Sequence, residues 1–327
     1  MDSSCRRSAG ESTSWLLAWN DSVSKIPDKR RAISCDFSFI MARFDLTKGK
    51  NFMEKRRFTL CASLILLLGL NGLQAQEKQS LKFAWPEEKK AAVCLTYDDG
   101  LDCHLDVAAP ALERHGFRGT FYVTGNSVSL NSRTGEWRAM AARGHELGNH
   151  TLFHPCHGST YDWVKPEYDL DSYTLERLMS ELFTANSLLK AVDGREERSF
   201  AYTCTNHTIK GLSFVDDIRT LFPAARGGGE MPAAMDQVDP YYVPSWGVVD
   251  PTGEELIQYV EQAIEQGTMA VIMFHSVGGG YLNVSSEAHE QLLSYLDEHS
   301  DILWVDTFQN VMKHVSSELL PFQAFTE

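Results

Sequence analysis

Uninterrupted apolar runs alternate with amphipathic segments along most of this chain, and this alternation limits the folds open to it. The runs 91–97 (AAVCLTY) and 269–274 (MAVIMF) are typical of strands buried on both faces. Similar patterns predict strands at 118–124, 146–149, 199–203, 221–226 and 302–305. Apolar residues at helical spacing predict helices at 104–115, 136–143, 172–192, 253–266, 285–299 and 306–315, with Ser286 as a candidate N-cap.

This order predicts an α/β protein with a parallel sheet and right-handed crossovers. An open doubly wound sheet and a closed barrel both satisfy the pattern. No Gly-x-Gly-x-x-Gly follows the first strand, so the sequence lacks the main motif of a dinucleotide-binding fold. The glycine runs at 227–229 and 278–280 lack the Lys-Ser/Thr ending of a phosphate loop.

The segment 53–75 has the pattern of an export signal. Basic residues at 55–57 precede a Leu-rich run over 58–70, and Ala75 offers a small residue for cleavage. The run is shorter than the roughly 20 residues that a bilayer span needs. We interpret Met53 as the start and 1–52 as an over-extended N-terminus; the alternative is a genuine extension with an internal anchor. We expect 76–327 to form one catalytic domain with no membrane span, periplasmic or extracellular after cleavage.

Charge and cysteine content exclude some functions. The 327 residues carry a net charge of −14, which disfavours nonspecific binding to nucleic acid or anionic lipid. Four cysteines (Cys94, Cys103, Cys156 and Cys204) follow the export signal and permit three pairings. No Cys-x-x-Cys pair is present, so no thiolate zinc site is expected.

Ionisable residues follow three of the predicted strands directly. Asp98 and Asp99 follow the first strand, His150 and His154 follow the short strand at 146–149, and His275 follows the strand at 269–274. In α/β folds, chemistry gathers where strands end and loops begin. Each cluster alone has an ordinary explanation as a turn, a surface pair or a core histidine. Their joint placement favours a site.

These residue types suit metal-assisted hydrolysis. Two histidines and one carboxylate can hold a divalent ion with positions left open for water. A second carboxylate could then act as a general base on that water. A third histidine could give a proton to the leaving group. Together they predict hydrolysis of an amide or ester.

The same residues resemble a known family. Thr96–Gly100 (TYDDG) and His150–His154 (HTLFH) resemble the first two motifs of the polysaccharide deacetylases (NodB-homology proteins, carbohydrate esterase family 4). The segment 119–123 (GTFYV) is similar to the second strand of that family, and 269–275 resembles its fifth motif. The resemblance covers about 86–315. It implies a distorted (β/α) barrel of the NodB-homology type.

The resemblance also implies roles. Asp98 would be the general base and His275 the general acid. Asp99, His150 and His154 would bind a divalent metal, zinc in most members. The substrate would be an acetylated carbohydrate polymer or oligomer, with N- and O-acetyl groups both open.

One motif departs from the family. At the third motif this chain reads 200–205 (FAYTCT), without the arginine that orients the catalytic aspartate in many members. Cys204 stands where a tyrosine supplies a backbone N–H to the oxyanion. We expect Arg226 as a candidate replacement for the guanidinium, and Trp246 as a candidate apolar wall or a core residue.

The altered motif keeps two alternatives open. One is a catalytically silent carbohydrate-binding protein on the same fold. The other is a metal-dependent hydrolase of non-sugar amides.

Overall fold

The computed structural model describes residues 83–323, with side chains through 319. The segments expected to be an over-extended N-terminus (1–52) and an export signal (53–75) lie outside the described residues. Among the described helices, none combines the length and apolar character needed to cross a bilayer.

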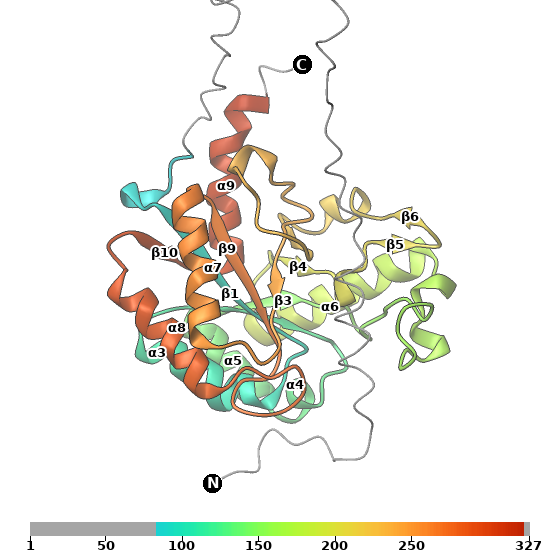
Figure 1. Cartoon of the computed structure of the whole chain (residues 1–327). Helices are drawn as coiled ribbons and strands as arrows, with labels where there is room; N and C mark the ends of the chain where they lie inside the picture. The colour runs from blue at the N-terminus through green and yellow to red at the C-terminus, as the bar shows by residue number, and fades with distance from the viewer. Residues whose placement is uncertain (1–82, 324–327) are drawn as a thin grey trace, which may run out of the picture. The chain divides into compact units, whose positions relative to one another are not determined.

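Parallel strands form one sheet of eight strands that curls into a distorted barrel (Figure 1). The order is β7-β4-β3-β2-β1-β9-β8, and β10 pairs with the beginning of β1. The strands are β1 Ala91–Asp98, β2 Thr120–Val123, β3 Glu146–Asn149, β4 Phe200–Ala201, β7 Ala225–Arg226, β8 Trp246–Gly247, β9 Met269–Phe274 and β10 Leu303–Val305. A separate antiparallel hairpin consists of β5 Thr208–Ile209 and β6 Leu212–Ser213.

The segment 243–247 closes the curl between the outer strands β7 and β8. Val243 accepts a hydrogen bond from Gly227 N at 2.8 Å and donates one to Ala225 O at 2.9 Å. Two residues later, β8 pairs with β9 through Trp246 and Ile272. The closure brings the end of β7 toward the barrel interior, with Arg226 fully buried.

Helices follow most of the strands, as the alternation predicts. They are α3 Ala109–Arg114, α4 Val128–Ser132, α5 Thr134–Ala142, α6 Leu175–Asp193, α7 Gly253–Gln266, α8 Ser286–Glu298 and α9 Phe308–Gln323, with a π-helical turn at His104–Ala108. Short 3-10 turns lie at Pro86–Glu88, Pro166–Tyr168, Leu170–Ser172, Thr203–Thr205, Asp217–Thr220 and Met235–Gln237.

The central strand β1 is buried on both faces, which explains its unbroken apolar sequence. Val93, Leu95 and Tyr97 pack in the core cluster that includes residues of α3, α5, α7 and α8. Ala92 and Cys94 point the other way, into a second cluster with the buried face of α9. A third cluster joins α6 to β4 and the loops after it.

Buried neutral histidines make the stability of this core sensitive to acid. The ring of His289 on α8 lies 2.8 Å (Nε2) from the Tyr97 hydroxyl, and burial lowers the pKa of His289 to about 4. Its contribution to stability is fully present above the unfolded-state pKa of about 6.5. That contribution falls as the pH drops toward the folded value, because the unfolded state then binds more protons.

We therefore expect the free energy of unfolding to fall by about 2 kcal/mol per such histidine between pH 7 and pH 5. Urea denaturation at both pH values measures this, with His289→Asn as the matched variant. The variant should lose less stability on acidification than the wild type. Equal losses in the two proteins would contradict the assignment.

Most predicted elements are confirmed. β3, α7 and β9 have the predicted bounds, whereas β4 and β7 are shorter than predicted. The N-cap prediction for α8 was wrong: Ser285, not Ser286, caps the helix and accepts a hydrogen bond from Ala288 N at 3.0 Å. Ser285 has the extended backbone that an N-cap requires, and the sequence offered two adjacent serines.

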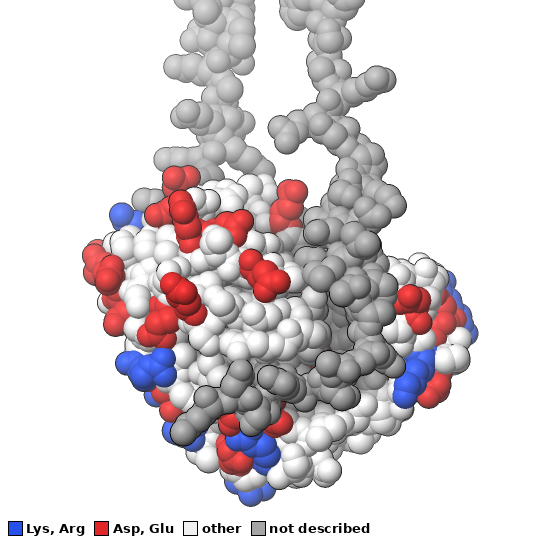
Figure 2. Space-filling model, turned by 60° about the horizontal axis from the view of Figure 1, so that its bottom comes forward, with Lys and Arg blue, Asp and Glu red and all other residues white. Residues whose placement is uncertain are grey.

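Acidic side chains gather on the flank that carries α7 and α8 (Figure 2). A groove at these helices is lined by Glu254, Glu261, Glu287, Glu290 and Glu298, among others. This surface agrees with the negative net charge of the chain.

Candidate active site

The predicted acids and histidines emerge from one edge of the barrel. Asp98 ends β1, and Asp99 follows it. His150 follows β3, and His275 follows β9. Because these strands are parallel and lie in the order β3-β2-β1-β9, their carboxyl ends share an edge (Figure 1).

Asp98 and Arg226 form a buried ion pair. Both Asp98 oxygens accept hydrogen bonds from Arg226 Nη2, at 2.7 and 2.5 Å. Arg226 Nη1 donates to Ser245 Oγ at 3.1 Å, and the guanidinium carbon lies 5.0 Å from the centre of the Tyr122 ring. Asp98 is 2% exposed. The structure thus places the guanidinium expected from Arg226 directly on Asp98.

Asp99, His150 and His154 bring three ligand atoms together, all within 4.8 Å of one another. Asp99 Oδ1 lies 3.6 Å from His150 Nε2 and 3.3 Å from His154 Nε2. That oxygen is buried and has no hydrogen-bond partner within the described residues. A buried carboxylate oxygen without a partner is costly, and a cation at this point would satisfy it. The donor set therefore fits a divalent metal ion.

A hydrogen bond selects the tautomer of His150 that a metal requires. Its Nδ1 donates to Ala201 O at 2.9 Å, so Nε2 is left with a free lone pair facing the carboxylates. Burial lowers the pKa of His150 to about 4. Burial alone would raise the pKa of Asp99, but the charges of His154, His275 and His150 outweigh it and lower that pKa. A neutral imidazole beside an ionised carboxylate is what metal binding needs.

The backbone at this site takes conformations that most residues avoid. Asp99, Thr151 and His154 have φ values of 78°, 65° and 55°. Side chains hold this turn: Thr151 N donates to Asn149 Oδ1 at 2.8 Å, and His154 N donates to Thr151 Oγ1 at 2.9 Å. Left-handed non-glycine residues cost energy and cluster at functional sites.

A separate set of contacts surrounds His275. Its Nδ1 is buried without a hydrogen-bond partner among the described residues, and its ring lies 5.7 Å from that of Tyr281. The His275 carbonyl accepts a hydrogen bond from His104 Nε2 at 2.8 Å, while His104 Nδ1 accepts one from Leu101 N at 3.2 Å. His104 thus ties the loop after β1 to the end of β9. Sequence reasoning missed this role because His104 fits the helical pattern around it.

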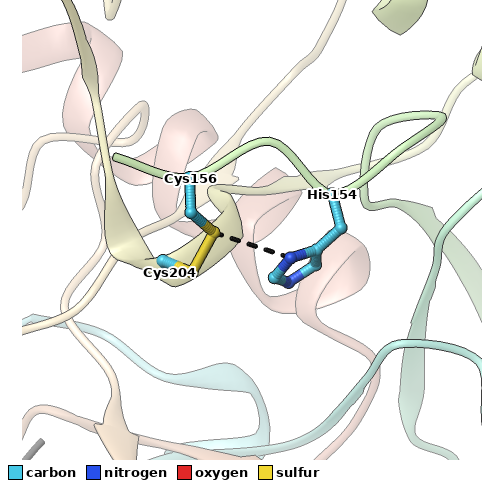
Figure 3. Close-up of side chains that lie close together, drawn as sticks. All are labelled: His154, Cys156 and Cys204. Atoms are coloured by element: carbon cyan, nitrogen blue, oxygen red, sulfur yellow. Dashed lines mark hydrogen bonds between the residues drawn. A yellow bond between two sulfur atoms is a disulfide. The ribbon is translucent and has the colours of Figure 1, made fainter. Parts of the chain in front are cut away.

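A disulfide adjoins the metal-ligand candidates (Figure 3). Cys156 and Cys204 are bonded, although they lie 48 positions apart in the sequence. This selects one of the three pairings that the sequence left open, while Cys94 and Cys103 lie buried outside it. The Cys204 side chain is therefore occupied by the bond, and His154 Nδ1 lies 3.5 Å from Cys156 Sγ.

Trp246 lies apart from this group of polar residues. Its ring is 5.0 Å from that of Tyr259 on α7, and it packs against the main core cluster. Of the two interpretations of Trp246, these contacts favour core packing.

Comparisons with known proteins bear on the segment that carries the first two motifs. Residues 86–210 match the family model for polysaccharide deacetylase, and this stretch contains both Asp98-Asp99 and 150–154. Such proteins form a class of hydrolases that act on amide or ester bonds. Within residues 86–210, the chain is therefore similar to the polysaccharide deacetylases.

Several relatives share parts of the chain. A gellan lyase from a Bacillus species is 24% identical over 257 residues, which are 70% of this chain and 10% of the relative. The peptidoglycan-N-acetylmuramic acid deacetylase of Bacillus subtilis is 26% identical over 34% of this chain and 37% of its own length. A chitin deacetylase of Colletotrichum lindemuthianum is 38% identical over 19% of this chain and 27% of its own. The chain therefore spans well under half the length of each.

A solved structure is also similar. A peptidoglycan deacetylase from Bacillus subtilis is 15% identical, with a TM-score of 0.45, and the alignment covers 74% of this chain and 100% of that one.

Proposed function

We propose that this protein is an exported, metal-dependent deacetylase that hydrolyses N- or O-linked acetyl groups on a carbohydrate polymer or oligomer. The observation that carries the proposal is the Asp98–Arg226 ion pair set beside the Asp99, His150 and His154 donor group. The family match and the relatives that act on peptidoglycan and chitin support the substrate class.

In this proposal Asp99, His150 and His154 hold the metal, which we take to be zinc. A bound divalent ion would lower the pKa of water and polarise the acetyl carbonyl. The ordered His150 ring and the partnerless Asp99 oxygen support this assignment.

Asp98 would take the proton from the attacking water. Each carboxylate oxygen of Asp98 has more than one lone pair, so the bonds from Arg226 leave capacity to accept that proton. Arg226 would fix the orientation of the carboxylate through the two hydrogen bonds from Nη2. Arg226 would thereby replace the arginine absent from the third motif.

His275 would protonate the departing nitrogen or oxygen. Its position at the end of β9, with its carbonyl held by His104, supports a fixed backbone at the same edge of the barrel. The backbone N–H at Cys204 would stabilise the oxyanion, since a backbone donor does not depend on the side chain.

The test is acetate release by the zinc-loaded protein from chitin oligomers, peptidoglycan and acetylated xylan. We expect acetate from one of these classes. Stoichiometric metal with no acetate from any of them would reject the deacetylase. It would favour the carbohydrate-binding or non-sugar amide alternatives.

A further inference from the structure

His154 faces two different sets of metal-ligand atoms with its two ring nitrogens. On one side, Nε2 lies 3.3 Å from Asp99 Oδ1. On the other, Nδ1 lies 3.5 Å from Cys156 Sγ, and the ligand atoms of His154, Cys156 and Cys204 are all within 4.8 Å of one another (Figure 3). One side chain is thus shared between two donor groups.

One pair of atoms in the second group already has the spacing of a zinc site. Zinc bonds of about 2.0 Å to imidazole nitrogen and about 2.3 Å to thiolate sulfur, at a tetrahedral angle, place the two ligand atoms about 3.5 Å apart. The separation between His154 Nδ1 and Cys156 Sγ is 3.5 Å. Two sulfurs and one imidazole nitrogen would leave a fourth position for water.

The disulfide keeps this second group closed to metal. Sulfur binds zinc well as a thiolate, and in the structure the two sulfurs are bonded to each other. His154 Nδ1 then has only a weak sulfur acceptor, and Nε2 remains available to the Asp99 side. Of these two donor sets, only the one with Asp99 and His150 is therefore competent in the oxidised protein.

We propose that reduction of the Cys156–Cys204 disulfide creates a second zinc site, formed by Cys156, Cys204 and Nδ1 of His154, which competes with the first. A dithiol reductant supplies two electrons and two protons, the S–S bond breaks into two thiols, and the reductant becomes a disulfide. Zinc binding then displaces the two thiol protons to solvent.

The competition follows from the single N–H of a neutral imidazole. When zinc binds Nδ1, the proton resides on Nε2, and Nε2 can no longer bind a metal beside Asp99. Soft thiolate ligands also favour zinc strongly. The reduced protein should therefore draw zinc away from the Asp99 and His150 side.

Sequence patterns did not predict a thiolate site, because no Cys-x-x-Cys pair is present. The fold supplies the pair instead, by placing the loop after β3 beside the turn after β4. Cys156 is fully buried, whereas Cys204 and His154 are only partly buried. A dithiol can thus reach the bond from the Cys204 side.

Cobalt(II) substitution tests the site without measuring turnover. The full protein is reduced with dithiothreitol, freed of reductant under anaerobic conditions, and titrated with cobalt(II). We expect a thiolate-to-cobalt charge-transfer absorption that saturates at one equivalent in the reduced protein and is absent from the oxidised protein. No such absorption in the reduced protein would overturn the proposal.

Matched variants identify which sulfur atoms produce the absorption. Cys156→Ser/Cys204→Ser should lack the absorption after reduction, while Cys94→Ala should keep it. Absorption that persists in the double variant would place the thiolate elsewhere and overturn the site. The comparison of oxidised with reduced wild-type protein needs no variant, so poor folding of a variant does not decide the result.

The regulatory consequence rests on the proposed function. Reduction in limiting zinc should lower acetate release at least tenfold, and reoxidation should restore it. Absence of acetate release in both redox states would count against the proposed function. The cobalt absorption alone decides whether the second site exists.

Discussion

Replacing Asp98 with asparagine is expected to lower acetate release by a factor of about 10²–10⁴, the usual contribution of a positioned general base. The metal should stay bound, because the proposed ligands are Asp99, His150 and His154. Asparagine keeps nearly the same shape and can still accept a hydrogen bond from Arg226, but it leaves the buried guanidinium without its counter-charge. Turnover is therefore compared per amount of folded protein. Steady-state acetate release and metal content of the same sample measure both effects.

Glu254→Gln is the matched control, since Glu254 is an exposed acid on α7, outside the site. This variant should retain wild-type turnover. Full activity in Asp98→Asn would remove Asp98 from the role of base. Loss of metal in Asp98→Asn would instead assign it to the ligands.

Replacing Arg226 with methionine is expected to destabilise the protein by about 3–5 kcal/mol, because it leaves the Asp98 carboxylate buried without its partner. Both residues are almost inaccessible to water, so solvent cannot screen the remaining charge. Turnover should also fall, because the carboxylate loses its orientation. Urea denaturation gives the free energy of unfolding.

Two further variants distinguish the effect of the unpaired Asp98 charge from a general loss of stability. Adding Asp98→Asn to Arg226→Met should recover part of the lost stability, since no unpaired charge remains. Arg198→Met breaks another buried pair, with Asp193 at 3.1 Å, and should lower stability without changing turnover of the folded protein. A loss below about 1 kcal/mol in Arg226→Met, the scale of an exposed pair, would contradict the account.

The long strands were predictable because burial on both faces leaves a continuous apolar run. β1 and β9 carry that signal, and their predicted bounds agree with the structure to within a residue. β8 was not predictable, since only Trp246 and Gly247 pair, and they do so because the barrel closes there. Such short ladders depend on tertiary contacts that a local pattern does not contain.

The grouping of Asp98, Asp99, His150 and His275 was predictable because each lies at the carboxyl end of a strand. The disulfide was not, because Cys156 and Cys204 lie 48 positions apart in the sequence and three pairings were equally consistent with the sequence. The place of Arg226 on Asp98 followed from expecting a replacement guanidinium, but its geometry required the closure beyond β7. His104 gave no signal outside its helical pattern.

The central claim is that Asp99, His150 and His154 hold a divalent ion that the reaction requires. The most direct measurement is acetate release by chelator-treated, oxidised protein during a zinc titration, on whichever acetylated polymer is the substrate. We predict no release without metal and a plateau at one equivalent of zinc, with no recovery in His150→Ala at that ratio. Full release from the metal-free protein would contradict the account.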